Sequence, residues 1–242
     1  MKWEDWNIED SWTYRLTFLN EEEGVLSCFV QDTEQITFLV YPVAEGEAEL
    51  RIQDIGLWSE IEEIENIPEI VIRKITKCII GALDVMGDAG YPEVSFLAEK
   101  ATKVEKILGS TRVVRKKYSE YMMYLPPEEV ENTINCSDTD EILRYEEEGG
   151  GYICRNADRS FFARVAPYGT GWYVYEVEVR YDRRRTGIGT ACMRLLAERF
   201  LQLYLQVGSY NEPAVCLYRK LGFQVIEELC YYGKAEEGMD QR

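Results

Sequence analysis

The chain has 242 residues, a formal net charge of −17 and no histidine. Nucleic-acid phosphates are bound by basic faces, and the chain offers no long basic run, so a nucleic-acid partner is excluded. Without histidine, the commonest general base, the commonest zinc ligand and every Ser-His or Cys-His nucleophile are excluded as well. We expect no metal site.

Hydropathy and cysteine usage indicate a cytoplasmic protein with no membrane partner. No apolar run approaches the roughly 20 residues that a membrane-spanning helix needs, and the amino terminus lacks the apolar core of a secretory signal. The seven cysteines include no Cys-x-x-Cys pair, and several occupy apolar positions of predicted elements. This pattern favours buried thiols over disulfides or metal ligands.

The first half of the chain is predicted to begin with strands and to continue with helices. Alternating apolar residues predict strands at 14–19, 25–31, 36–43 and 48–57. Apolar residues then recur at three- and four-residue steps from Ile67 to Met86, which predicts a long helix with Pro68 in its first turn. A strand at 94–98, a helix at 102–108 and a strand-rich stretch to Leu125 follow.

The second half repeats this order. After Pro126-Pro127 we expect a helix near 140–148, and then strands at 152–155, 161–166 and 172–179. A helix at 189–203, a strand at 205–209, a short helix and a last strand to Tyr232 complete the half. We therefore expect an α+β protein of two similar domains, residues 1–125 and 126–242. Its sheets should be mixed and mostly antiparallel, with helices on both faces.

A glycine loop joins the strand at 172–179 to the following helix. It reads Arg184-Arg185-Thr186-Gly187-Ile188-Gly189. Two glycines let the backbone approach a ligand closely, and the first turn of a helix presents unpaired N–H groups at the positive end of the helix dipole. The loop therefore predicts an anion site, and we favour a diphosphate. Taken alone, the pattern also fits a basic turn without a ligand.

A second motif follows the next predicted strand. Residues 211–223 read Asn-Glu-Pro-Ala-Val-Cys-Leu-Tyr-Arg-Lys-Leu-Gly-Phe, and their apolar spacing predicts a short helix that ends at Gly222. Together, the two motifs resemble those of the GNAT superfamily of acyl-CoA-dependent N-acyltransferases, over roughly residues 149–232. In that family the glycine loop holds the CoA pyrophosphate through its backbone amides, and the asparagine contacts the pantetheine. The resemblance implies cofactor contacts for Val177, Val179, Arg184, Arg185, Thr186, Gly187, Ile188, Gly189, Thr190, Asn211, Ala214 and Tyr218.

The resemblance also implies direct attack of an amine on the acyl thioester, with Tyr218 as the proton donor to the departing thiolate. A backbone N–H near Val177 to Val179 would bind the carbonyl oxygen. Glu176 and Glu178 alternate with apolar residues, so we expect both carboxylates on one face of the strand, where either could accept the amine proton. The alternatives are a packed aromatic residue at Tyr218 and a solvated strand face at the two glutamates.

The first half lacks the chemistry of the second. When the halves are aligned on Gly109 and Gly222, Tyr218 corresponds to Glu105 and Asn211 to Ala98. The turn at residues 58–65 carries four carboxylates and no glycine where a pyrophosphate would have to bind, and like charges repel it. We interpret the first half as a degenerate GNAT-like domain without CoA; an ordinary α+β accessory domain is the alternative.

The sequence therefore predicts an N-acetyltransferase that moves an acetyl group from acetyl-CoA to the amine of a small molecule or peptide. Transfer of another acyl group is an alternative, and so is a non-catalytic CoA-binding regulatory or interaction protein. The negative charge of the chain either serves solubility or attracts a cationic amine. A monomer and a dimer both fit the sequence.

Overall fold

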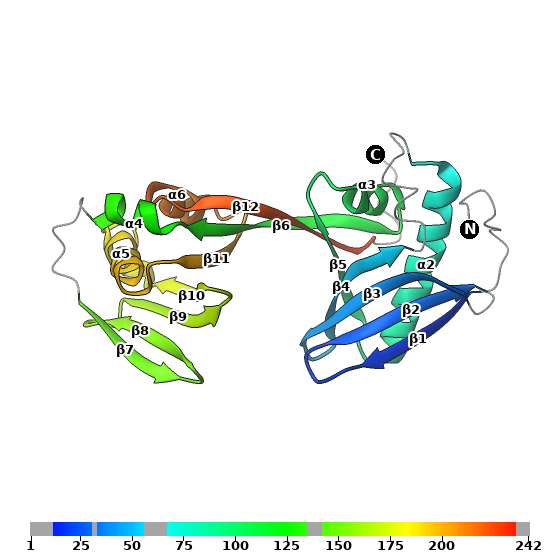
Figure 1. Cartoon of the computed structure of the whole chain (residues 1–242), viewed down its shortest axis with the longest axis horizontal. Helices are drawn as coiled ribbons and strands as arrows, with labels where there is room; N and C mark the ends of the chain where they lie inside the picture. The colour runs from blue at the N-terminus through cyan, green and yellow to red at the C-terminus, as the bar shows by residue number, and fades with distance from the viewer. Residues whose placement is uncertain (1–11, 31–32, 56–66, 135–141, 236–242) are drawn as a thin grey trace. The chain divides into compact units, whose positions relative to one another are not determined.

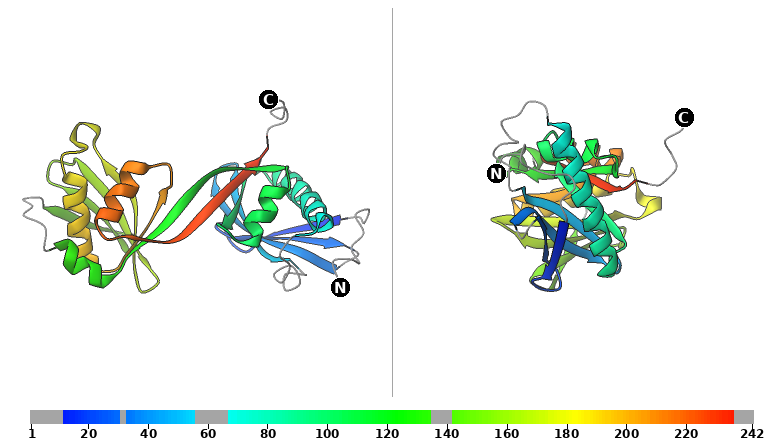
Figure 2. Two further views of the ribbon diagram at one scale, coloured as in Figure 1. Left: turned by 90° about the horizontal axis from the view of Figure 1, so that it is seen from above. Right: turned by 90° about the vertical axis from the view of Figure 1, so that its right-hand side faces the viewer.

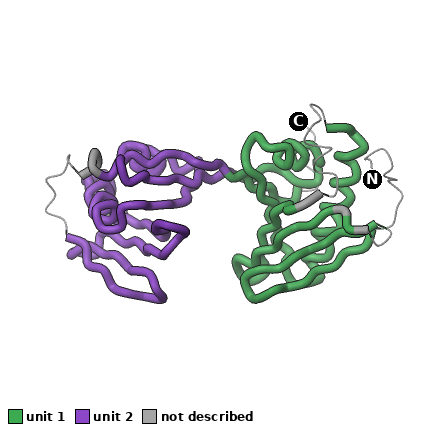
Figure 3. Tube along the Cα trace, viewed as in Figure 1, with its two compact units in different colours: residues 1–118, 229–242 green, residues 119–228 purple. Residues whose placement is uncertain are grey.

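The computed structural model describes residues 12–30, 33–55, 67–134 and 142–235. The chain forms two compact units: unit 1 comprises residues 1–118 and 229–242, and unit 2 comprises residues 119–228 (Figure 3). The domain boundary expected after Leu125 lies at the end of a strand, whereas the units divide within that strand. The carboxyl-terminal residues, expected in the second domain, belong to unit 1 from Leu229 onwards.

Unit 1 places its strands in the spatial order β1-β2-β3-β4-β5-β12 (Figure 1). Its neighbouring strands are antiparallel except β4 and β5, which are parallel. Along the chain the elements are β1 (Trp12–Phe18), β2 (Gly24–Val30), β3 (Thr33–Ala44), β4 (Glu47–Ile55), α2 (Glu69–Asp88), β5 (Glu93–Glu99), α3 (Lys103–Ser110), the start of β6 (Val114–Leu125) and the end of β12 (Gln224–Lys234). The predicted strands and helices of this half are confirmed wherever they fall on described residues.

The core of unit 1 follows from alternation in the strands and from helical periodicity in α2. Leu26, Phe38 and Phe96, from three different strands, are fully buried. Figure 2 shows α2 running along one side of these strands. The helix contributes the apolar face predicted from its spacing: Val71, Ile75, Cys78, Ile79, Ala82 and Met86.

Unit 2 places its strands in the spatial order β6-β11-β10-β9-β8-β7. The pairs are antiparallel except β10 and β11, which are parallel. Residues 120–125 of β6 pair with β11, so a strand that begins in unit 1 completes the sheet of unit 2. The other elements are α4 (Pro127–Ile134), β7 (Leu143–Glu148), β8 (Gly151–Asn156), β9 (Phe161–Tyr168), β10 (Gly171–Val179), the 3₁₀ turn η2 (Tyr181–Arg183), α5 (Ile188–Phe200), β11 (Leu203–Gly208) and α6 (Glu212–Lys220).

The helix expected near 140–148 is wrong over its described residues, because Leu143–Glu148 is strand β7. Gly149 and Gly150 both have positive φ, 57° and 84°, and join β7 to β8 as a two-residue hairpin turn. Pairing with β8 overrides the helix propensity of the glutamates. The helix of this segment is α4 instead, with Pro127 at its start and two glutamates in its first turn.

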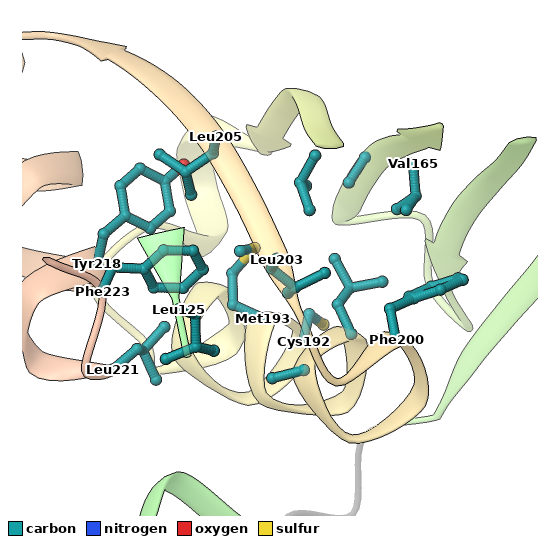
Figure 4. Close-up of a cluster of buried hydrophobic side chains, with 14 of the residues drawn as sticks. Leu125, Val165, Cys192, Met193, Phe200, Leu203, Leu205, Tyr218, Leu221 and Phe223 are labelled. Carbon is teal, nitrogen blue, oxygen red and sulfur yellow. The ribbon is translucent and has the colours of Figure 1, made fainter. Parts of the chain in front are cut away.

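The core of unit 2 lies between one face of its sheet and helices α4, α5 and α6, as Figure 4 shows in part. Strands β6 and β11 contribute alternate residues, such as Met123, Leu203 and Leu205, all of which are essentially inaccessible. In each unit, the described helices therefore pack onto a single core, whereas we had expected helices on both faces. The other face of the unit 2 sheet carries the intervening residues, Tyr204 and Tyr124 among them.

Candidate active site

A β-bulge interrupts β10. The strand pairs regularly with β9 as far as Tyr175, and pairing resumes at Glu178, which lies opposite Phe162. Glu176 and Val177 therefore face a single residue of β9, and Glu176 adopts a positive φ of 50°. Glu176 and Glu178 are both exposed, and Val177 and Val179 both pack against the core, so the shared face of the two carboxylates stays a prediction.

Strands β10 and β11 pair over only part of their lengths. The parallel register covers Trp172–Val174 against Leu203–Leu205, although β10 continues to Val179 and β11 to Gly208. Beyond Val174, the described residues of the two strands form no further pairs, so the edge of β10 presents backbone groups that a ligand can use. Val177 and Val179, the predicted position of the carbonyl-binding N–H, lie on this stretch and pack against the core.

The glycine loop ends at the N-terminus of α5. Gly187 is the N-cap residue, with φ 91°, and its carbonyl accepts the first backbone bond of the helix, from Ala191 N–H at 2.9 Å. The N–H groups of Ile188, Gly189 and Thr190 precede that bond and therefore lack helical partners. A Cβ added at Gly187 would meet no atom within 4 Å. The loop thus combines free amides, a helix dipole and open space, which suits a phosphate group.

Besides its predicted place in the anion-binding loop, Gly189 has a packing role. Its added Cβ would lie 3.3 Å from Val179 and 3.5 Å from Leu217, so the missing side chain lets α5 approach β10 and α6 closely. Asn211 caps α6, because its side-chain oxygen accepts the N–H of Ala214 at 3.4 Å.

The three arginines of the loop differ in their contacts. Arg183 lies 3.6 Å from Asp158 and lowers the pKa of that carboxyl, together with the stronger hydrogen bonds from Ser160. The Nε of Arg184 donates to the carbonyl of Val179 at 3.0 Å. The exposed Arg185 makes no hydrogen bond or ion pair with any residue that the structure describes. Thr186 stabilises the loop by donating its hydroxyl to the carbonyl of Arg183 at 2.7 Å.

Tyr218 is buried, with 6% of its surface exposed, and its ring packs against Phe223 at a centroid distance of 5.6 Å. The ring extends from α6 towards Leu205, the last residue of β11 that pairs with β10 (Figure 4). Burial raises the pKa of Tyr218 to about 12, so the phenol keeps its proton at neutral pH. Within the described part of the chain its hydroxyl has no hydrogen-bond partner. The hydroxyl is therefore protonated at neutral pH, and its role as the proton donor stays a prediction.

The two carboxylates of β10 are not equivalent. Glu176 accepts a hydrogen bond from Arg164 at 2.8 Å, and Arg164 also pairs with Glu148 of β7. These carboxylates raise the pKa of Arg164, with the Glu176 bond as the largest cause. Glu178 is exposed and forms no ion pair among the described residues. Of the two, Glu178 has the carboxylate more available to a substrate.

Sequence reasoning missed a row of tyrosines on the sheet face that the described helices leave uncovered. Successive ring centroids lie 4.8 Å apart for Tyr124 and Tyr204, 5.2 Å for Tyr204 and Tyr168, 5.7 Å for Tyr168 and Tyr173, and 6.1 Å for Tyr173 and Tyr175. We call these five residues the tyrosine face. They come from strands β6, β9, β10 and β11, and no motif in the sequence marks them as a group.

The described residues include neither a metal-binding cluster nor a membrane-spanning helix. No group of three or more Cys, Asp or Glu side chains is arranged to hold a metal ion in this part of the chain. Among the helices that the structure describes, none is long and apolar enough to cross a membrane.

Comparison with known proteins places this site in a family. The sequence profile of the acetyltransferase (GNAT) family matches residues 118–223, which coincide closely with unit 2. An N-alpha-acetyltransferase from Sulfurisphaera tokodaii is 38% identical over 66 residues. That match spans 25% of this chain and 40% of the relative.

Solved structures share the fold over both units. A GCN5-related N-acetyltransferase from Sphaerobacter thermophilus matches with a TM-score of 0.62 and 11% identity, over 93% of this chain and 84% of that chain. A tandem GNAT protein from the clavulanic acid biosynthesis pathway matches with a TM-score of 0.57 and 8% identity, over 94% of this chain and 86% of that chain.

Residues 118–223 match the acetyltransferase (GNAT) family, and this segment contains the interrupted strand pair, the glycine loop and the buried tyrosine. The α+β class with a mostly antiparallel sheet is confirmed.

Proposed function

We propose that the protein is an N-acetyltransferase that moves an acetyl group from acetyl-CoA to the amine of a small molecule or peptide. One observation carries the proposal: the open N-terminus of α5, the separation of β10 from β11 and the hydroxyl of Tyr218 occur together in unit 2. Each meets a different need of the reaction, namely anion binding, access to the acyl group and protonation of the leaving thiolate.

The residues present fit acetyl-CoA. The amides of Gly187 to Thr190 would bind its pyrophosphate, and the exposed Arg185 would add a positive charge beside it. The unpaired edge of β10 at Val177 to Val179 would bind the pantetheine and the acyl carbonyl oxygen. When bound, acetyl-CoA would supply an acetyl thioester at the point where the two strands separate.

Three tasks fall to the protein during transfer. A backbone N–H of β10 stabilises the negative charge that develops on the carbonyl oxygen. Tyr218 donates its proton to the departing sulfur; with a pKa of about 12, it is protonated at neutral pH. Glu178, or Glu176 if it is released from Arg164, accepts the proton of the amine directly or through water.

The relative from Sulfurisphaera tokodaii supports an α-amine, such as that at the N-terminus of a peptide, as the acceptor, because its name specifies that position. We further propose that only unit 2 binds acetyl-CoA. The acidic turn at 58–65, on which this expectation for the first half depends, lies outside the described residues.

A thiol-release screen tests the proposal. The full chain is incubated with acetyl-CoA and, in turn, with polyamines, amino acids, arylalkylamines, aminoglycosides and short peptides. We expect at least one amine to release free thiol well above the rate of spontaneous hydrolysis. Tight binding of acetyl-CoA with no acceptor in any class would instead favour a regulatory CoA-binding protein.

A further inference from the structure

The tyrosine face lies beside the point where β10 and β11 separate. Tyr173 and Tyr204 are cross-strand neighbours, and the next pair, Val174 with Leu205, is the last that the two strands form. Beyond this last pair the two strands separate, and we call this point the opening. Tyr175 and Gln206 therefore flank the opening on the side of the sheet opposite the helices. A molecule lying on this face would reach the opening from the side that α5 and α6 leave uncovered.

A carboxylate from a third strand is fixed at the same place. Glu120 of β6 is half-buried, and its Oε2 accepts a hydrogen bond from the side-chain amide of Gln206. The pKa of Tyr173 is raised to about 12, mainly by burial and further by the charges of Glu120 and Tyr168. The negative charge of Glu120 therefore acts on Tyr173. Glu120 of β6 therefore contributes negative charge to the tyrosine face as far as Tyr173 of β10.

The arginines of β8 and β9 are already engaged. Arg164 is held between Glu176 and Glu148, and Arg155 pairs with Glu146 at 2.8 Å. A cation that comes to the face would thus meet a carboxylate and the electron-rich faces of tyrosine rings. An anion would meet the same carboxylate and be repelled.

We propose that the tyrosine face and Glu120 form the acceptor site for a primary ammonium compound with an apolar or aromatic body and no carboxylate beside its amine. The body of the compound lies on the tyrosine rings, and Glu120 holds the ammonium near the opening. Glu120 is thus a specificity-determining residue. The inference rests on the proposed function, since it names the substrate class of that enzyme.

The test compares two amines that differ by one carboxylate, 2-phenylethylamine and phenylalanine. We expect kcat/KM with acetyl-CoA to be at least about tenfold higher for 2-phenylethylamine. Glu120→Gln keeps the shape of the side chain and removes its charge. It should raise the KM for 2-phenylethylamine by about tenfold or more and change kcat by less than about threefold.

Glu93→Gln is the matched control, because Glu93 is exposed and lies in unit 1. It should leave both constants unchanged. Equal use of the two amines, no use of 2-phenylethylamine, or an unchanged KM in Glu120→Gln would each overturn the inference.

Calorimetry separates this inference from the proposed function. Acetyl-CoA and 2-phenylethylamine are titrated separately into the unmodified protein and into Glu120→Gln. If acetyl-CoA does not bind, the proposed function fails, while weaker binding of the amine to Glu120→Gln would still support the site. If acetyl-CoA binds and turns over but the amine binds both proteins equally, only the acceptor site is overturned.

Discussion

Tyr218→Phe removes one hydroxyl and leaves the packed ring in place. The ring contact with Phe223 does not involve the hydroxyl, and no described residue bonds to it, so we expect the free energy of unfolding to change by less than about 0.5 kcal/mol. A positioned acid contributes about 10²-fold or more to the rate. We therefore expect kcat to fall by at least that factor, equivalent to about 2.7 kcal/mol of activation free energy.

The assay is thiol release with the best acceptor from the screen, accompanied by calorimetric titration of acetyl-CoA. Acetyl-CoA affinity should be nearly unchanged, which would separate loss of chemistry from loss of binding. Tyr232→Phe is the matched control, because Tyr232 is similarly buried, at 4% exposed, and donates its hydroxyl to Glu105 in unit 1 at 3.1 Å. The control should lower stability and leave kcat unchanged. Full turnover by Tyr218→Phe would refute the proton-donor role.

Three further predictions concern the phosphate-binding loop, the number of sites and the buried tyrosines. Gly187→Val should abolish acetyl-CoA binding in calorimetry. Gly90→Val is the control, because Gly90 also has a positive φ (95°) and an unobstructed Cβ position, and it should only lower stability. Equal acetyl-CoA affinities of the two variants would contradict the loop assignment. Titration should give one acetyl-CoA per chain, and a second equivalent site would show that unit 1 also binds the ligand. Burial raises the pKa values of Tyr145, Tyr173 and Tyr218 to about 12, from an ordinary value of 10.0. Because the folded state holds these protons more tightly, their contribution to stability is complete below about pH 10 and is lost as the pH rises towards 12. The urea concentration at the midpoint of unfolding should therefore decrease as the pH rises above about 10. A midpoint that stays constant over this pH range would contradict the burial of these residues.

The order of helices and strands could be predicted because most elements show regular apolar spacing. The periodicity from Ile67 to Met86 predicted α2, and alternation predicted β8 to β10. The glutamates of β7 misled the prediction, since their helix propensity opposes the hairpin that Gly149 and Gly150 impose. Local propensity loses to pairing when a turn brings a partner strand alongside.

The two motifs predicted the turn before α5 and the short helix that carries Tyr218, because each motif is contiguous in sequence. The bulge could not be predicted, since Glu176 adopts a left-handed conformation that glycine would normally mark. Glu120 and the tyrosine face were missed for another reason. They meet only because β6 pairs with β11, far along the chain, and such long-range pairing leaves no local pattern.

The central claim is that unit 2 transfers an acetyl group from acetyl-CoA to an amine. The most direct measurement is the product balance of a reaction with the best acceptor, in which free CoA thiol and N-acetylated amine are quantified in the same sample. We predict equal amounts of the two products, with both lost in Gly187→Val. Thiol release without acetylated amine, or acetyl-CoA binding without either product, would contradict the claim.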